Sequence, residues 1–79
     1  MPRNTEIEYE IEKEIGVLGQ SFRGWQKELN LIRWNGKNSK FDIRDWSPNH
    51  ESMSKGITLN EDEARALYCV LGEYFEKNQ

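Results

Sequence analysis

Residues 25–46 read WQKELNLIRWNGKNSKFDIRDW, and they contain the strongest signals for secondary structure in the chain. Asn35-Gly36 lies near its middle, and both residues accept the positive φ angles that a type I′ hairpin turn requires. We therefore expect one strand before the turn, over 25–34, and another after it, over 40–46. The apolar residues of the first strand change parity between Leu31 and Ile32, which predicts a β-bulge or a change of partner near its end.

The segment before this hairpin predicts another strand. Residues 6–18 alternate between apolar side chains and five glutamates, with Lys13 as the one break in the apolar set. A period of two is typical of a strand with one buried face. The glutamates are interpreted as a solvated or edge-protecting row rather than a metal site, because side chains along one strand diverge. Residues 19–24 and 47–52 have the composition of loops.

The C-terminal part of the chain predicts a short strand and a helix. Residues 55–59 can form the fourth strand, and Asn60 with Glu63 three residues later forms a capping-box pattern. The helix is expected over about 61–77. Its apolar residues occupy a stripe wider than one small sheet needs: Ala64, Leu67, Tyr68, Val70, Leu71, Tyr74 and Phe75. The predicted fold class is α+β, with four antiparallel strands followed by one C-terminal helix.

The size of the chain limits how it can be stabilised. With 79 residues, 35% of them hydrophobic, we expect a single domain over 1–79, with the sheet over about 6–59. Cores of this size rarely supply more than about 3–5 kcal/mol. One cysteine and one histidine exclude an internal disulfide and a Cys/His zinc site, which leaves dimerisation. The predicted dimer interface is the surplus of the helical stripe, at Leu67, Val70, Leu71 and Tyr74.

Charge is unevenly distributed along the chain. The net charge of −3 divides into −3 over 1–19, +3 over 20–57 and −3 over 58–79. A basic middle between acidic flanks can present one positive face, although short chains also show such fluctuations without function. No apolar stretch approaches the roughly 20 residues that span a bilayer, and the N-terminus has no apolar signal region. We therefore expect a cytoplasmic protein, with association with the nucleoid as an alternative.

The basic segment also contains most of the aromatic residues that suit nucleic-acid binding. Cations that follow phosphates and rings that stack on bases bind single strands without reading sequence. Arg44 and Trp46 share the polar parity of the strand over 40–46, and Trp34 is expected to lie on the same face. We expect the two indole rings and the Arg44 guanidinium to stand out from this face into water. The structural alternative is that Trp34 and Trp46 cover the edge of the core while the cations are only solvated.

Catalysis has little support in the sequence. His50 lies in a polar loop without an evident nucleophile, and Cys69 lies beside the apolar stripe of the helix. Asp42 and Asp45 point to opposite faces of their strand, so they do not form a carboxylate pair. We predict a protein that is not an enzyme and that uses no cofactor, metal or small-molecule substrate. The rival class is a protein-binding adaptor that uses the same exposed rings.

Three motifs in order resemble a known family. The Asn35-Gly36-Lys37 turn, the run over 42–46 and the Lys-Gly-Ile-Thr-Leu run over 55–59 before a capped helix are similar to the positive-cofactor-four family of single-stranded DNA-binding proteins. The similarity is greatest to its small bacterial, YdbC-like branch. It implies a curved four-stranded sheet, a homodimer with helices at the interface, and sequence-tolerant binding of single-stranded DNA in transcription regulation, replication or repair. RNA is not distinguished from DNA by these motifs.

The resemblance also implies roles for particular residues. Four cations would line the channel: Lys27, Lys37, Arg44 and Lys55. Trp34 would be the stacking ring before the turn, and Trp46 holds the next aromatic position; Trp25 completes the candidate set. Lys27 shares parity with the apolar residues of its strand, so it reaches the binding face only through twist, a bulge or the dimer. Eukaryotic members place a further aromatic where this chain has Ser47.

Overall fold

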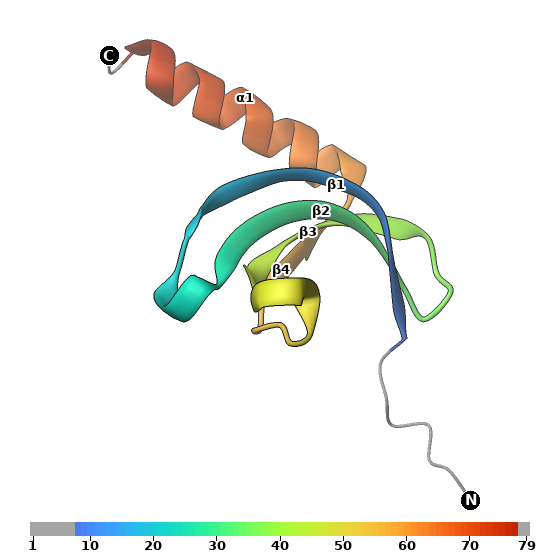
Figure 1. Cartoon of the computed structure of the whole chain (residues 1–79). Coiled ribbons are helices and arrows are strands. Elements are labelled where there is room, and N and C mark those ends of the chain that lie inside the picture. Colours follow the sequence, from blue (N-terminus) through green and yellow to red (C-terminus); the bar gives the residue numbers. More distant parts are fainter. Residues whose placement is uncertain (1–7, 78–79) are drawn as a thin grey trace, which may run out of the picture.

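The sheet and the helix predicted from the sequence are both present. The computed structural model describes residues 8–77. Its elements are β1 (Tyr9–Gln20), the 3₁₀ turn η1 (Phe22–Gly24), β2 (Gln26–Trp34), β3 (Ser39–Trp46), the 3₁₀ turn η2 (Pro48–His50), β4 (Ile57–Leu59) and α1 (Glu61–Lys77). The strands form one antiparallel sheet in the order β1-β2-β3-β4, and α1 follows, so the α+β fold is confirmed (Figure 1). The first two residues of the expected first strand, Glu6 and Ile7, lie outside the described residues.

The central hairpin forms as its turn residues require. Asn35 has a φ of 50° and Gly36 a φ of 74°, so both adopt the positive values expected from the sequence. The Lys37 N–H donates to the Trp34 carbonyl oxygen at 2.8 Å and closes the turn. The Asn35 Oδ1 also accepts a hydrogen bond from the Glu8 N–H at 3.0 Å, which ties the start of β1 to the turn.

The bulges of the sheet lie in β1 and not, as expected, near the end of β2. β2 and β3 pair without a shift from Gln26–Trp46 to Arg33–Ser39. The register of β1 against β2 shifts at three places, between Ile11 and Lys13, Glu14 and Gly16, and Val17 and Gly19. The parity change within β2 needs no bulge, because this strand has apolar neighbours on both faces. Bulges bend the strand that contains them, and β1 arches over the sheet in Figure 1.

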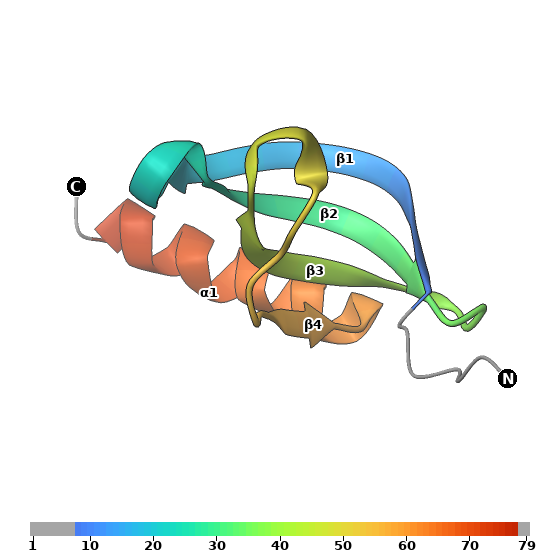
Figure 2. The same cartoon turned by 60° about the horizontal axis from the view of Figure 1, so that its bottom comes forward.

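The curved sheet has two chemically different faces. The concave face contains Tyr9, Glu28, Asn30, Ile32, Trp34, Asp42, Arg44 and Trp46. The convex face contains Lys27, Leu29, Leu31, Phe41, Ile43 and Asp45. α1 lies on the convex side, and the segment that includes η2 folds against the concave side, where it crosses β2 and β3 in Figure 2. The most deeply buried residues lie on the concave face, which includes Ile32 at 0% and Trp46 at 1% exposure.

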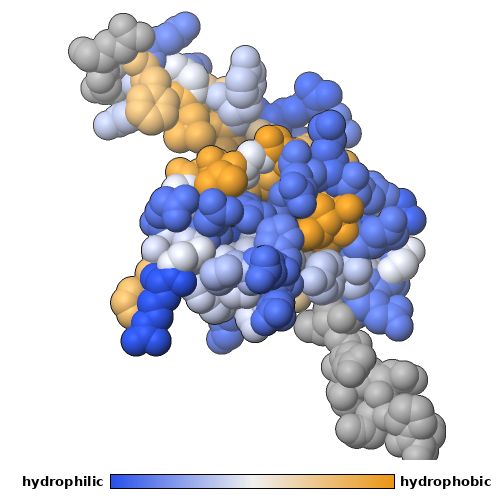
Figure 3. Space-filling view, viewed as in Figure 1, coloured by the Kyte–Doolittle hydropathy of each residue, from blue (hydrophilic) through white to orange (hydrophobic). Residues whose placement is uncertain are grey.

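The helix begins where its capping residues predict. The Asn60 Oδ1 accepts from the Glu63 N–H at 2.8 Å, and the Glu63 Oε1 accepts from the Asn60 N–H at 2.9 Å. α1 then packs against β3 and β4 at its beginning and leaves most of its length uncovered. Six large apolar side chains of α1 are exposed: Leu67, Tyr68, Val70, Leu71, Tyr74 and Phe75. Figure 3 shows apolar side chains along much of this helix.

Candidate nucleic-acid interface

A pocket on the concave side brings together several residues of the basic aromatic segment. It has a volume of about 350 Å³ and is lined by Trp34, Lys37, Lys40, Arg44 and Thr58. The hairpin contributes most of these residues, because even-numbered positions of β2 and β3 share one face and Lys37 follows the turn. Trp34, Lys37 and Arg44 were expected from the sequence as site residues. Thr58 was not, and it is present because β4 pairs with β3 at Asp42.

Arg44 is fixed inside this pocket and does not stand free in water. Its Nε and Nη2 donate to the two carboxylate oxygens of Asp42, each at 2.7 Å, while its Cζ lies 4.8 Å from the centre of the Trp34 ring. The side chain of Arg44 is 13% exposed and that of Asp42 is 0% exposed. The expectation of a projecting guanidinium is therefore wrong, because a buried carboxylate on the same face holds and neutralises it. Arg44 instead fixes one side of the Trp34 indole.

The lysines near the pocket differ from Arg44 in their surroundings. Lys37, Lys40 and Lys55 are exposed. Within residues 8–77, none of these three lysines forms an ion pair with a carboxylate. Lys55 does not line the pocket, but it precedes Gly56, which is pressed against β3. A Cβ on Gly56 would lie 2.3 Å from the Ile43 carbonyl oxygen and 2.4 Å from the Arg44 Cβ. The segment with Lys55 therefore passes directly beside Arg44.

Trp46 is buried, contrary to the expectation that it stands out from the sheet. It is 1% exposed, and its ring lies 5.6 Å from the Tyr9 ring and 4.7 Å from the His50 imidazole. Its parity was predicted correctly, but η2 and the start of β1 cover the concave face at this point. Trp46 is thus a core residue and offers no free ring face to a nucleobase. Trp34 is half-buried and keeps part of its ring at the pocket.

Two further candidate residues lie away from the pocket. Lys27 is on the convex face, where its Nζ lies 3.2 Å from Asp45 Oδ1. The bulges that would have been needed to turn it are in β1 and not in β2. The hydrogen bond from Ser21 is the main cause of a lowered pKa at Asp45, and it and Lys27 together outweigh the effect of burial. Trp25 is half-buried just before β2 and does not line the pocket either.

A known protein family matches the part of the chain that forms the pocket. The family model described as Transcriptional Coactivator p15 (PC4) matches residues 21–69, which include η1, the central hairpin, η2 and β4. The chain belongs to the PC4 family. It is also 45% identical over 68 residues to an uncharacterized protein of Treponema pallidum (strain Nichols), and this match covers 86% of the chain and 80% of the relative. The resemblance to small bacterial members of this family, inferred from the sequence, is confirmed.

A polar network in this PC4-family chain holds η2 against the sheet. The His50 Nε2 lies 3.0 Å from both carboxylate oxygens of Glu28, which also accept hydrogen bonds from Asn30 at 3.1 Å and Gln26 at 3.2 Å. Burial alone raises the pKa of the Glu28 carboxyl, but the hydrogen bonds from His50, Asn30 and Gln26 outweigh it, and the pKa is lowered. This contact could not be predicted from the sequence, because 22 residues separate His50 from Glu28.

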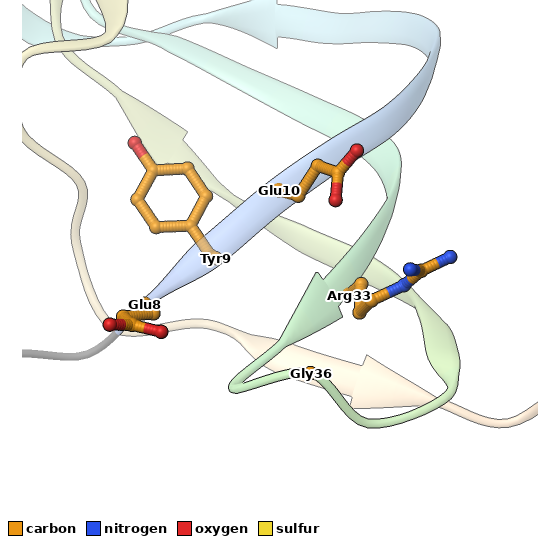
Figure 4. A pocket seen from close by; sticks show the side chains of 5 residues that line it. All are labelled: Glu8, Tyr9, Glu10, Arg33 and Gly36. Atoms are coloured by element: carbon orange, nitrogen blue, oxygen red, sulfur yellow. The ribbon is translucent and has the colours of Figure 1, made fainter.

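A second hollow lies at the beginning of β1, beside the hairpin turn. It has a volume of about 260 Å³ and is lined by Glu8, Tyr9, Glu10, Arg33 and Gly36 (Figure 4). Arg33 forms an ion pair with Glu12, a residue whose pKa is lowered first by the Ser39 hydroxyl and then by Arg33, against the effect of burial. Two carboxylates and one neutralised cation do not suit a phosphate. This hollow in the PC4-family fold is therefore not the candidate interface.

Within 8–77 there is no group of three or more His, Cys, Asp or Glu residues that could hold a metal ion. In the same range, no helix has the length and apolar character needed to cross a membrane. The glutamates of β1 between positions 8 and 14 are exposed, as their reading as a solvated row predicts.

Proposed function

We propose that this PC4-family protein binds single-stranded DNA, with little preference for sequence, at the pocket formed by Trp34, Lys37, Lys40, Arg44 and Thr58. One observation supports the proposal: the same pocket contains the partly exposed indole of Trp34 and two lysines, Lys37 and Lys40, that form no ion pair within residues 8–77. Base stacking on aromatic rings contributes about 1–3 kcal/mol per base and accepts any base. Duplex reading needs a helix or ribbon in a groove, whereas α1 carries acidic residues in its first turn.

Each pocket residue has a distinct role in this proposal. Lys37 and Lys40 meet phosphates, and Lys55 extends the positive rim beyond Gly56. Trp34 stacks against a base on the part of its ring that Arg44 and the Tyr9 ring leave open. Arg44 is mainly a positioning residue, because Asp42 already takes both ends of its guanidinium. The Thr58 hydroxyl can donate to or accept from the sugar or base edge.

The proposed binding unit is a homodimer. Leu67, Val70, Leu71 and Tyr74 would form the interface along α1, where they are 36%, 57%, 45% and 57% exposed. A contiguous apolar face of this kind marks an interaction surface, and a second copy of α1 offers it a matching apolar partner. In this proposal residues 1–79 form one binding domain of a cytoplasmic protein that acts on exposed single strands during transcription, replication or repair, without a catalytic step.

Two lysines on opposite faces give the decisive experiment. An unstructured oligonucleotide is titrated into the protein at several salt concentrations while tryptophan fluorescence is recorded. Wild type should be quenched, with affinity falling as salt rises because counterions are released. Lys37→Ala should weaken binding and reduce the salt slope by about one unit, whereas Lys27→Ala should do neither, since Lys27 lies on the convex face.

Three outcomes of this titration would count against the proposal. Absence of binding at low salt would reject the proposed function. Equal effects of Lys27→Ala and Lys37→Ala would reject the concave pocket as its site. Homopolymeric and mixed sequences should bind with similar affinity, and a strong preference for one of them would reject sequence tolerance.

A further inference from the structure

The turn η1 exposes an aromatic ring beside an unpaired cation. Phe22 is 73% exposed, and the Arg23 Cζ lies 4.9 Å from the centre of its ring. An exposed aromatic ring offers a face on which a nucleobase can stack. The pair repeats the chemistry of Trp34 and Arg44, in which a guanidinium covers one side of a ring. A stacking partner would therefore find the other face of Phe22 open.

Arg23 differs from Arg44 in its charge environment. Among residues 8–77, no carboxylate lies within ion-pair distance of Arg23, whereas Arg44 is held by Asp42 at 2.7 Å. The positive charge at η1 is therefore available to an anionic ligand. A ring and a free cation together suit a nucleobase with its neighbouring phosphate.

The backbone holds this pair in a fixed position. The Ser21 N–H donates to the Trp25 carbonyl oxygen at 2.6 Å, and the Trp25 N–H donates to the Phe22 carbonyl oxygen at 3.1 Å. Arg23 has a φ of 59°, which side chains other than glycine rarely adopt, and Gly24 follows with a φ of 83°. The Ser21 hydroxyl donates to Asp45 at 2.9 Å and fastens the turn to β3. Such preorganisation lowers the conformational entropy that the turn loses on binding a ligand.

The turn η1 lies at the end of β2 opposite Trp34 and its pocket. In Figure 1, η1 lies at one end of the curved sheet, on the side away from α1. In Figure 2 it lies at the end of the concave side. β2 runs from this turn to Trp34 at the other end. A hollow of about 340 Å³ lies along the same side. Its lining includes Glu14, Glu28 and His50, and no lysine or arginine among residues 8–77. Attractive contacts with a polyanion are therefore expected at the two ends of the concave side, in the Trp34 pocket and at η1.

We infer that Phe22 and Arg23 form a second contact for a single nucleic-acid strand whose other part lies in the Trp34 pocket. A base stacks on the open face of Phe22, and Arg23 meets the adjacent phosphate. This inference rests on the proposed function and adds a distal anchor to it. It assigns a binding role to Phe22, which the sequence pattern did not single out, and to the neighbouring Arg23 of the basic segment.

Oligonucleotide length tests the distal anchor separately from the pocket. Affinities are measured for single strands of about 5 and about 15 nucleotides, within the range of site sizes seen for single-strand binders. Phe22→Ala should leave the short strand unaffected and weaken the long strand roughly 5- to 150-fold, the equivalent of one lost stacking contact. Phe22→Tyr keeps a ring of the same shape and should restore the long-strand affinity. Arg23→Gln should reduce the salt slope for the long strand only.

Each other outcome overturns the inference. Unchanged affinity of Phe22→Ala for both lengths removes the anchor and leaves the proposed function standing. Equal weakening for both lengths means that the ring acts through the fold of the pocket. Loss of a co-purifying protein with unchanged oligonucleotide affinity assigns η1 to a protein partner. Failure of wild type to bind either strand rejects the proposed function, and the anchor with it.

Discussion

The Arg44–Asp42 pair allows a quantitative test of how the concave face is built. Arg44→Met removes the guanidinium and leaves the Asp42 carboxylate, 0% exposed, without its cation. At 2.7 Å and an effective dielectric constant of about 20, the gross attraction of the pair is about 6 kcal/mol. Desolvation of both groups offsets part of it, and the measured cost of breaking such pairs is about 3–5 kcal/mol. That loss equals most of the stability that a core of this size supplies.

A double variant separates the pair from the packing. Replacing both residues by apolar ones, Asp42→Leu with Arg44→Met, removes the unpaired charge, and such replacements are often neutral or stabilising. The free energy of unfolding is measured by urea denaturation with circular dichroism at one fixed protein concentration, because dimerisation would make it concentration-dependent. The single variant should unfold at much lower urea than the double variant. A loss below about 1 kcal/mol in Arg44→Met, or a double variant no more stable than the single one, would refute the reasoning.

Three further predictions follow from particular contacts. Gly56→Ala should lower the free energy of unfolding by about 1–3 kcal/mol, because its Cβ would lie 2.3 Å from the Ile43 carbonyl oxygen; an unchanged thermal midpoint would contradict this close approach. The lowered pKa of Glu28 means that its contribution to stability is complete above the ordinary value of 4.5 and is lost as pH falls through the lower value of the folded state. Urea midpoints should therefore fall less between pH 7 and pH 3 in Glu28→Gln than in wild type, and equal falls would show that the contact with His50 adds nothing. Leu71→Asp should convert the proposed dimer to a monomer by light scattering, since Leu71 lies on the exposed face of α1; a mass unchanged by this charge would remove α1 from the interface.

Elements set by local chemistry could be predicted from the sequence. The Asn35-Gly36 turn adopts its positive φ values, and Asn60 and Glu63 exchange their two capping hydrogen bonds. In both cases the deciding atoms lie within a few residues of each other. Parity likewise placed Trp34 and Arg44 on one face, and they meet there at 4.8 Å. Lys27 lies on the opposite face with its apolar neighbours, as its own parity indicates.

The burial of Trp46 could not be predicted, because a distant segment covers that part of the concave face. Parity gave the direction of Trp46 but not its burial, because η2 is held over it by His50 and Glu28, residues far apart in the sequence. The neutralisation of Arg44 could have been found, since Asp42 lies two residues away on the same face. Phe22 was missed because it lies in a turn between glycines, outside the alternating strands. An aromatic residue next to an arginine in a polar turn was the available signal.

Amide chemical shifts can map the surface on which this protein contacts single-stranded DNA, which is proposed to be the concave pocket. A short single-stranded oligonucleotide is added to isotope-labelled protein, and shift changes are followed for each backbone amide and for the indole N–H groups. If the strand binds in the concave pocket, the shifts should change most at Trp34, Lys37, Lys40 and Thr58. Lys27, on the convex face, should change little. Changes confined to α1 or to the convex residues of β2 and β3 would contradict binding in this pocket.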